Sequence, residues 1–187
     1  MSYSDRSMRS YTAPLLAPAS AASSSQHGYD VGLLLLRCMV GLTMAAHGAQ
    51  KLFGWFGGQG LDATGHGFAE SGYSAPKAMA VVAGLTEVVG GAGLFLGLLT
   101  PLSAAAVVGI MINAMAVKAG GGFFAPAGIE YDLVLLAAAV CLAFAGPGRY
   151  AVDHLLPVLR AHRLFHGVAA VAFGAVAAGL VLLIARN

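Results

Sequence analysis

Three ionisable side chains lie inside the first long apolar segment of the sequence, at residues 31–53: Arg37, His47 and Lys51. Arg37 and Lys51 share one helical stripe with small residues, because positions 37, 41, 44, 48 and 51 recur every three or four residues. An ionised side chain near the middle of a membrane helix costs about 2.5 to 3.5 kcal/mol, so each one needs a polar partner. His47 is the group that could exchange a proton near neutral pH. We therefore expect the stripe to face neighbouring helices, with His47 beside it.

Glu87 is the candidate partner for this stripe. It lies near the middle of the second apolar segment, on a face that also carries Gly84, Gly90 and Gly91. In antiparallel helices, a rise of 1.5 Å per residue brings Arg37 and Glu87 to levels about 6 to 7 Å apart, which predicts an Arg37–Glu87 pair. In an alternative interpretation, the two cations extend to opposite membrane surfaces and Glu87 is a neutral acid bonded to a backbone carbonyl.

Two later segments add polar groups at comparable depths. Asn113 lies in the third apolar segment, and Tyr131 stands between Glu130 and Asp132 at the start of the fourth. Polar side chains from four helices are thus expected to converge on one site. In that site we assign proton transfer to Glu87 and His47, and ligand binding to Arg37, Lys51, Asn113 and Tyr131. A purely packing role for His47 stays open.

The composition sets the class of protein. The chain has 187 residues, of which 58% are hydrophobic and 10% charged. A soluble domain carries roughly a quarter of charged residues, so this is expected to be a membrane protein. A net charge of +2 without a basic cluster excludes a nucleic-acid-binding protein. Cys38 and Cys141 have no CxxC or Cys/His spacing, so no metal site is predicted.

The apolar segments predict the elements that must position these residues. A bilayer core about 30 Å thick needs about 20 helical residues, and candidate spans fall at 31–53, 78–98, 102–119, 131–146 and 167–185. Pro101 stops one helix and permits the next first turn, so the second and third spans are expected to be antiparallel neighbours. The predicted fold is an all-α integral membrane four-helix bundle with an additional C-terminal transmembrane helix. Its parts are a disordered tail at 1–29, the bundle at 30–156, and a connection with the fifth helix at 157–187.

Two further patterns concern the ends of the helices. HGAQKLFGWF closes the first span and AMAVKAGGGFF closes the third, and both place a lysine about one turn before a Gly-aromatic exit. This echo fits an old duplication, although glycine and aromatic residues are common at any membrane interface. The distribution of Lys and Arg favours a cytoplasmic N-terminus. One side holds Arg6, Arg9, Arg149, Arg160 and Arg163; the other holds Lys51, Lys77, Lys118 and Arg186.

Taken in order, several segments resemble the DoxX family. LLLRCMVGLTMAAHGAQKLFG is similar to the first helix of that family, TEVVGGAGLFLGLLTP to its second helix and turn, and GPGRYAVDHL to its closing motif, which ends in aspartate. The resemblance covers roughly residues 30 to 156. It implies a small four-helix membrane protein of bacteria or archaea, and it places Arg37, His47, Lys51 and Glu87 at the polar positions of the family and Asp153 at the end of its closing motif. The N-terminal tail and the fifth helix depart from the pattern.

The resemblance also implies a function. The family takes its name from a membrane subunit of a thiosulfate:quinone oxidoreductase, and relatives are connected with thiol and oxidative-stress defence. We therefore expect a multi-pass subunit of a redox complex in the cell membrane, with a quinone-sized pocket among the first four helices. The chain carries no flavin, haem or cluster motif, so the redox cofactor is expected on a protein partner. The alternative is a non-catalytic membrane anchor or assembly module for a soluble enzyme, and a homo-oligomer is also possible.

Overall fold

The computed structural model describes residues 19–124, 126–157 and 162–186. All regular elements in these ranges are helices, apart from an isolated bridge between Tyr73 and Arg186. In chain order they are α1 (Ala19–Phe53), η1 (Trp55–Gly57), α2 (Gly60–Glu70), α3 (Pro76–Leu96), α4 (Thr100–Val117), α5 (Glu130–Ala145), η2 (Val152–Leu155) and α6 (Leu164–Ala185). The all-α prediction is confirmed.

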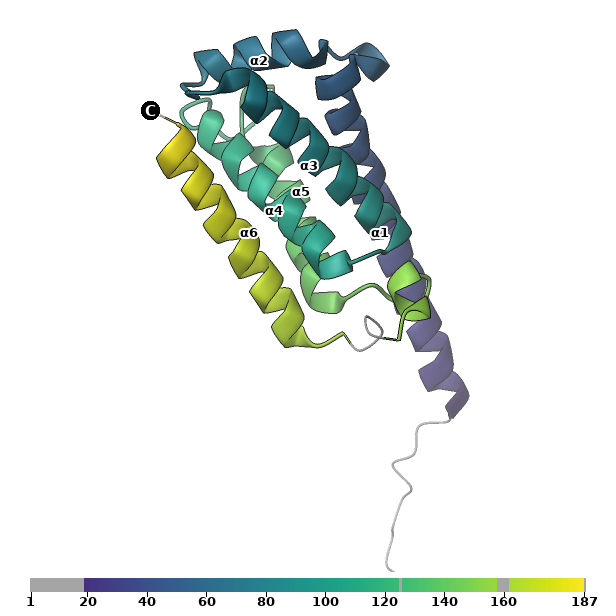
Figure 1. Ribbon diagram of the computed structural model, residues 1–187. Coiled ribbons are helices and arrows are strands. Elements are labelled where there is room, and N and C mark those ends of the chain that lie inside the picture. Colours follow the sequence, from purple (N-terminus) through teal and green to yellow (C-terminus); the bar gives the residue numbers. More distant parts are fainter. Residues whose placement is uncertain (1–18, 125, 158–161, 187) are drawn as a thin grey trace, which may run out of the picture.

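The long helices form a bundle suited to a membrane. Within the described residues, four segments are long and apolar enough to cross a bilayer: Gln26–Phe53 of α1, and the whole of α3, α4 and α6. With 16 residues, α5 is shorter. It nevertheless packs against α4 and α6 as a member of the bundle (Figure 1). The chain is thus a multi-pass, all-α membrane protein.

The predicted spans agree with the observed helices to within a few residues, with two exceptions. The first helix begins at Ala19 rather than at residue 31, so part of the expected tail is helical, while residues 1–18 lie outside the described ranges. The second exception is α2, which was not predicted and lies across one end of the bundle (Figure 1). Its sequence, GLDATGHGFAE, contains three glycines, which are poor helix formers, and no long apolar run.

Glycines set the register between α1 and α3. A β-carbon on Gly41 would lie 2.6 Å from the carbonyl oxygen of Gly91, and one on Gly48 would lie 2.6 Å from that of Gly84. Such distances are shorter than any real side chain tolerates, so only glycine lets the two backbones approach this closely. The predicted stripe on α1 therefore does face a neighbouring helix, and the glycine face of α3 is buried against it.

The glycine contacts between α1 and α3 hold Arg37 far from Glu87, so the predicted Arg37–Glu87 pair is wrong. Glu87 lies at the level between Gly41 and Gly48, more than two helical turns from Arg37. Arg37 instead donates hydrogen bonds to the carbonyl oxygens of Tyr150 at 2.6 Å and Leu94 at 3.5 Å. The estimate of depth failed because it was made from the ends of the two spans, whereas the register of α1 on α3 is set by the contacts of Gly41 with Gly91 and of Gly48 with Gly84.

Arg37 belongs to a packed polar cluster that we call the closed end, made of Arg37, the α3–α4 turn at 97–100 and residues 150–153. The carboxylate of Asp153 accepts hydrogen bonds from the backbone N–H groups of Leu99 at 2.7 Å and Thr100 at 2.8 Å. These are free donors at the start of α4, and Leu99 has a φ of 48°, which a capping carboxylate helps to hold. Arg37 and Asp153 are 0% and 2% exposed. The closed end thus connects α1 and the α3–α4 turn to residues 150–153 through buried hydrogen bonds.

Candidate functional site

A cavity of about 840 Å³ runs along α4, and its polar part lies at the end of the bundle opposite the closed end. It follows α4 from Leu102 to Lys118, and α1, α2, α3, α5 and α6 supply the rest of its wall. Ala105, Ala106 and Gly109 of α4 are lining residues with little or no side chain, so they leave space beside the helix. The volume lies in the range of about 300 to 1,000 Å³ that is typical of small-molecule sites.

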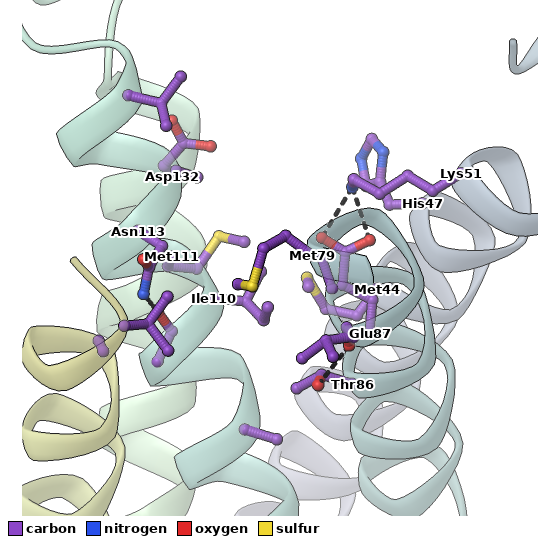
Figure 2. Close-up of a pocket in the computed structure, with 18 of the residues that line it drawn as sticks. Met44, His47, Lys51, Met79, Thr86, Glu87, Ile110, Met111, Asn113 and Asp132 are labelled. Carbon is purple, nitrogen blue, oxygen red and sulfur yellow. Dashed lines mark hydrogen bonds and ion pairs between the residues drawn. The ribbon is translucent and has the colours of Figure 1, made fainter. Parts of the chain in front are cut away.

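Most of the wall is apolar, but one end is polar, and its central feature is an ion pair. Lys51 of α1 donates to both carboxylate oxygens of Glu87 on α3, at 2.7 and 2.6 Å (Figure 2). The Glu87 side chain is only 4% exposed, while that of Lys51 is 29% exposed. Buried carboxylates need such a partner, because an unpaired charge in an apolar interior is costly. Lys51 thus links the buried acid to the cavity.

A second ion pair of the same kind lies in the cavity wall. Lys118, just after α4, donates to Asp132 on the first turn of α5 at 2.7 Å. The side-chain exposures are 36% for the lysine and 5% for the aspartate, close to those of the first pair. Neither residue was among the candidate site residues. The signal available in the sequence was the repeated lysine before a Gly-aromatic exit, followed by an acid at the start of the next apolar segment.

His47 and Tyr131 connect the two walls. The Nε2 atom of His47 lies 3.1 Å from the Tyr131 hydroxyl, and its Nδ1 atom lies 3.1 Å from Oε1 of Gln50. Both ring nitrogens therefore have partners, which fixes the orientation of the imidazole. Because Tyr131 precedes Asp132 and His47 lies one turn before Lys51, this contact places the two ion pairs around the same polar end.

Asn113 lines the cavity from α4. Its amide nitrogen donates to the carbonyl oxygen of Gly109 at 3.0 Å, and its oxygen accepts from the hydroxyl of Tyr73 at 3.3 Å. Tyr73 lies in the α2–α3 connection, where burial raises the pKa of its hydroxyl. The Tyr73 hydroxyl thus stays protonated and acts as a donor. Figure 2 shows Asn113 and Asp132 on one wall, facing Lys51, His47 and Glu87 on the other.

The structure therefore brings together five of the six predicted site residues, and it excludes one. Glu87, His47, Lys51, Asn113 and Tyr131 all line the cavity, whereas Arg37 belongs to the closed end. Their chemical roles stay predictions. Among the described residues, no three His, Cys, Asp or Glu side chains are grouped to hold a metal ion.

The cavity reaches the outer surface of the bundle along its side. Val82 of α3, Leu102 of α4 and Phe173 of α6 line it and are 51%, 55% and 64% exposed. These are apolar residues of membrane-spanning helices, so this edge faces lipid.

The polar end, by contrast, is covered by α2, whose residues Ala63, Thr64 and Gly67 line the cavity. Arg186 donates to the carbonyl oxygens of Ser71 at 3.0 Å and Ala116 at 2.9 Å. These bonds connect the end of α6 to the end of α2 and to α4.

Comparisons with known proteins agree with this architecture. The DoxX family model matches residues 32–120 of the chain. A protein of Bacillus subtilis (strain 168) named "Putative oxidoreductase CatD" is 33% identical over 129 residues, which cover 67% of this chain and 87% of that relative. No solved structure matches the chain significantly.

Proposed function

Because this chain belongs to the DoxX family, we propose that it is the membrane subunit of a redox complex and that it binds a quinone in the cavity beside α4. The observation that carries the proposal is the cavity itself. It combines about 840 Å³ of mainly apolar space, an edge on the lipid-facing surface, and ionisable donors at one end. A quinone has the matching form, with an apolar tail and ring and carbonyl oxygens that accept hydrogen bonds.

The residues present fit such a ligand. Lys51 has three N–H donors on its ammonium group, and Glu87 takes two of them. The third can point to a carbonyl oxygen in the cavity. The Tyr131 hydroxyl donates its hydrogen to Nε2 of His47, because Nδ1 of His47 donates to Oε1 of Gln50, and it therefore offers a ligand a lone pair rather than a donor. Met44, Met79 and Met111 lie between the two walls (Figure 2), where unbranched thioether side chains adapt to the shape of a ring.

Proton transfer is the chemical role that we assign to the Lys51–Glu87 pair. A bound quinone would accept two electrons and two protons. Glu87 is buried, and Lys51 is its partner on the side of the cavity, so the pair could pass both protons, one after the other, to an oxygen bonded to Lys51, and would be reprotonated from bulk solvent after each transfer. The electrons come from a cofactor on a partner protein.

Glu87→Gln tests this role, because it keeps the size of the side chain and its ability to bind Lys51 but cannot carry the proton. Membranes with the variant should lose quinone-linked turnover by about 100-fold, as for removal of a general acid–base group. Quinone binding to the purified protein should change little. The matched control is Glu70→Gln, at the exposed end of α2. Turnover that survives Glu87→Gln unchanged would contradict the role.

The anchor function remains the second candidate, and one observation favours it. With 35 residues α1 is about 52 Å long, against about 30 Å for a bilayer core, and its first turns extend beyond the bundle (Figure 1). A protruding helix of this kind is a suitable docking element for a partner. An anchor alone predicts that removal of residues 1–25 releases the partner, while Glu87→Gln affects neither partner binding nor turnover.

We further propose that the N-terminus is cytoplasmic. One contact supports the grouping of charges on which this depends: the backbone N–H of Arg149 donates to the carboxylate of Asp30 at 3.0 Å, so Arg149 lies at the same end of the bundle as the start of α1. Labelling of a cysteine placed at position 29 by a membrane-impermeant reagent in intact cells is expected to fail. Labelling at position 57, at the opposite end, is expected to succeed.

A further inference from the structure

The Lys118–Asp132 pair has no role in the function proposed so far. It sits in the wall of the same cavity as Lys51–Glu87, and the two pairs are alike in geometry. Their N–O distances are 2.7 and 2.6 Å, and in each pair a lysine that is about one-third exposed covers an almost fully buried carboxylate. They come from different parts of the bundle, because the first pair joins α1 to α3 and the second joins the end of α4 to α5.

The pairs stand on opposite walls. Figure 2 shows Asp132 on one side of the cavity and the Lys51–Glu87 pair on the other, with the methionine side chains in the space between. At the edge, the His47–Tyr131 contact of 3.1 Å connects the walls. A ligand ring in this space therefore has an ammonium group on each side of it.

The charges at this end balance. Lys51 and Lys118 are offset by Glu87 and Asp132, so an anionic head group would add an uncompensated charge to an apolar site. A neutral acceptor adds none. Of the three N–H donors on each ammonium group, Glu87 takes two from Lys51 and Asp132 takes one from Lys118, which leaves donors on both walls.

We propose that Lys118 and Asp132 form the second head-group contact of the site, and that the ligand is a neutral ring carrying an oxygen acceptor at each of two opposite edges. One oxygen faces Lys51 and the other faces Lys118. This deepens the proposed function and rests on it, because it assigns the part of the site that a 1,4-quinone would use with its second oxygen. It also makes Lys118 a specificity-determining residue.

The experiment compares two ligands on the full-length protein in lipid nanodiscs. The first probe is a 1,4-naphthoquinone with a short isoprenoid tail, and the second has the same tail and ring system but a single ketone oxygen. The unmodified protein should bind the quinone about tenfold more tightly, since one hydrogen bond to a charged donor is worth about 1.4 kcal/mol or more. In Lys118→Gln this advantage should fall severalfold, because a shorter and neutral amide replaces the charged donor.

Two controls separate the role of Lys118 in binding from its role in holding α4 to α5. Lys77→Gln removes a lysine whose partner Asp62 is exposed and outside the cavity, and it should preserve the tenfold advantage. Asp132→Asn keeps the shape of the pair and provides a folded second variant. In this variant the advantage should change by more than twofold, because the position and charge of Lys118 depend on the carboxylate.

The outcomes are distinguishable. If the protein binds the quinone but Lys118→Gln weakens both ligands by the same factor, the pair only supports the fold and this inference is overturned, while the proposed function stands. If the unmodified protein binds neither ligand, the proposed function fails and this inference fails with it.

Discussion

The two ends of the bundle both bury charged residues, but they do so in different ways. At the closed end, Arg37 and Asp153 are almost fully buried and hydrogen-bond to backbone groups of other segments. At the cavity end, Lys51, Glu87, Lys118 and Asp132 form side-chain pairs beside about 840 Å³ of open volume. The cavity-end lysines are about one-third exposed, whereas Arg37 is 0% exposed.

This difference indicates that buried charged residues have different roles at the closed end and at the cavity end. Hydrogen bonds to backbone carbonyls and N–H groups fix the relative positions of chain segments, so the closed end joins α1, α3 and α4 to the segment that follows α5. Pairs between flexible side chains rearrange more easily than these backbone contacts. Each lysine also keeps an N–H donor that can bind a ligand. We infer that the closed end provides stability and that the cavity end provides function.

The largest expected effect is at the closed end. Arg37→Met should lower the free energy of unfolding by about 3 kcal/mol, because it leaves the Tyr150 carbonyl without a donor and the buried Asp153 without a nearby cation. Thermal unfolding in detergent measures this loss. Arg149→Met is the matched control, since its side chain is exposed at the same end. Comparable losses in both variants would show that the closed end is not a special junction.

A smaller loss is expected at the cavity end. Lys51→Met leaves the Glu87 carboxylate buried without its partner, but one face of the pair is open, so the cost should be about 2 kcal/mol. Lys77→Met removes the exposed partner of Asp62, whose side chain is 83% exposed, and should cost less than about 0.5 kcal/mol. The two variants unfolding at the same temperature would argue that the Lys51–Glu87 pair is effectively solvated.

Filling the cavity should separate binding from stability. Ala177 lines the cavity from α6, so Ala177→Phe projects a ring into space that is already open and should change stability by less than about 1 kcal/mol. Binding of a tailed quinone should nevertheless weaken by at least tenfold. The control is Ala175→Phe, at an exposed position of the same helix outside the cavity wall. Unchanged affinity in Ala177→Phe would place the ligand elsewhere.

The smallest effect concerns the cover of the cavity end. The hydrogen bond from Lys77, together with its charge, lowers the pKa of Asp62 on α2. A carboxylate whose pKa is lowered on folding adds stability above its unfolded pKa, and this stability is lost as the pH falls through the folded value. Asp62→Asn should therefore melt slightly below the unmodified protein at pH 6, and the difference should shrink as the pH falls below the ordinary range of an aspartate pKa. A difference that does not change with pH would rule out this cause.

Much of the fold was predictable from local sequence. The predicted second, third, fourth and fifth spans end within three residues of α3, α4, α5 and α6, because Pro, Gly and charged residues mark helix ends wherever the apolar run stops. The stripe on α1 was also predictable, since small and polar residues at helical spacing have to face another helix. The helix α2 was not predicted, because its three glycines and short length give no helical signal. It forms over the end of the bundle.

The residues of the site could be predicted from the sequence, but the ion pairs that they form could not. Glu87, His47, Lys51, Asn113 and Tyr131 were recognisable as polar groups that hydrocarbon does not tolerate alone, and all of them line one cavity. Which cation meets which acid was not recognisable. An error of one or two turns in the register changes the partner, as the wrong Arg37–Glu87 pair shows. The Lys118–Asp132 pair needs a loop conformation that no periodicity describes.

The sequence by itself thus determined that the chain is a helical membrane protein with its charges turned inward, because hydropathy and helical spacing are local properties that add along the chain. Only the tertiary structure decided which charges meet and where space is left. Those features depend on contacts between helices, above all on the close approach of Gly41 to Gly91 and of Gly48 to Gly84, which fixes the register of α1 on α3.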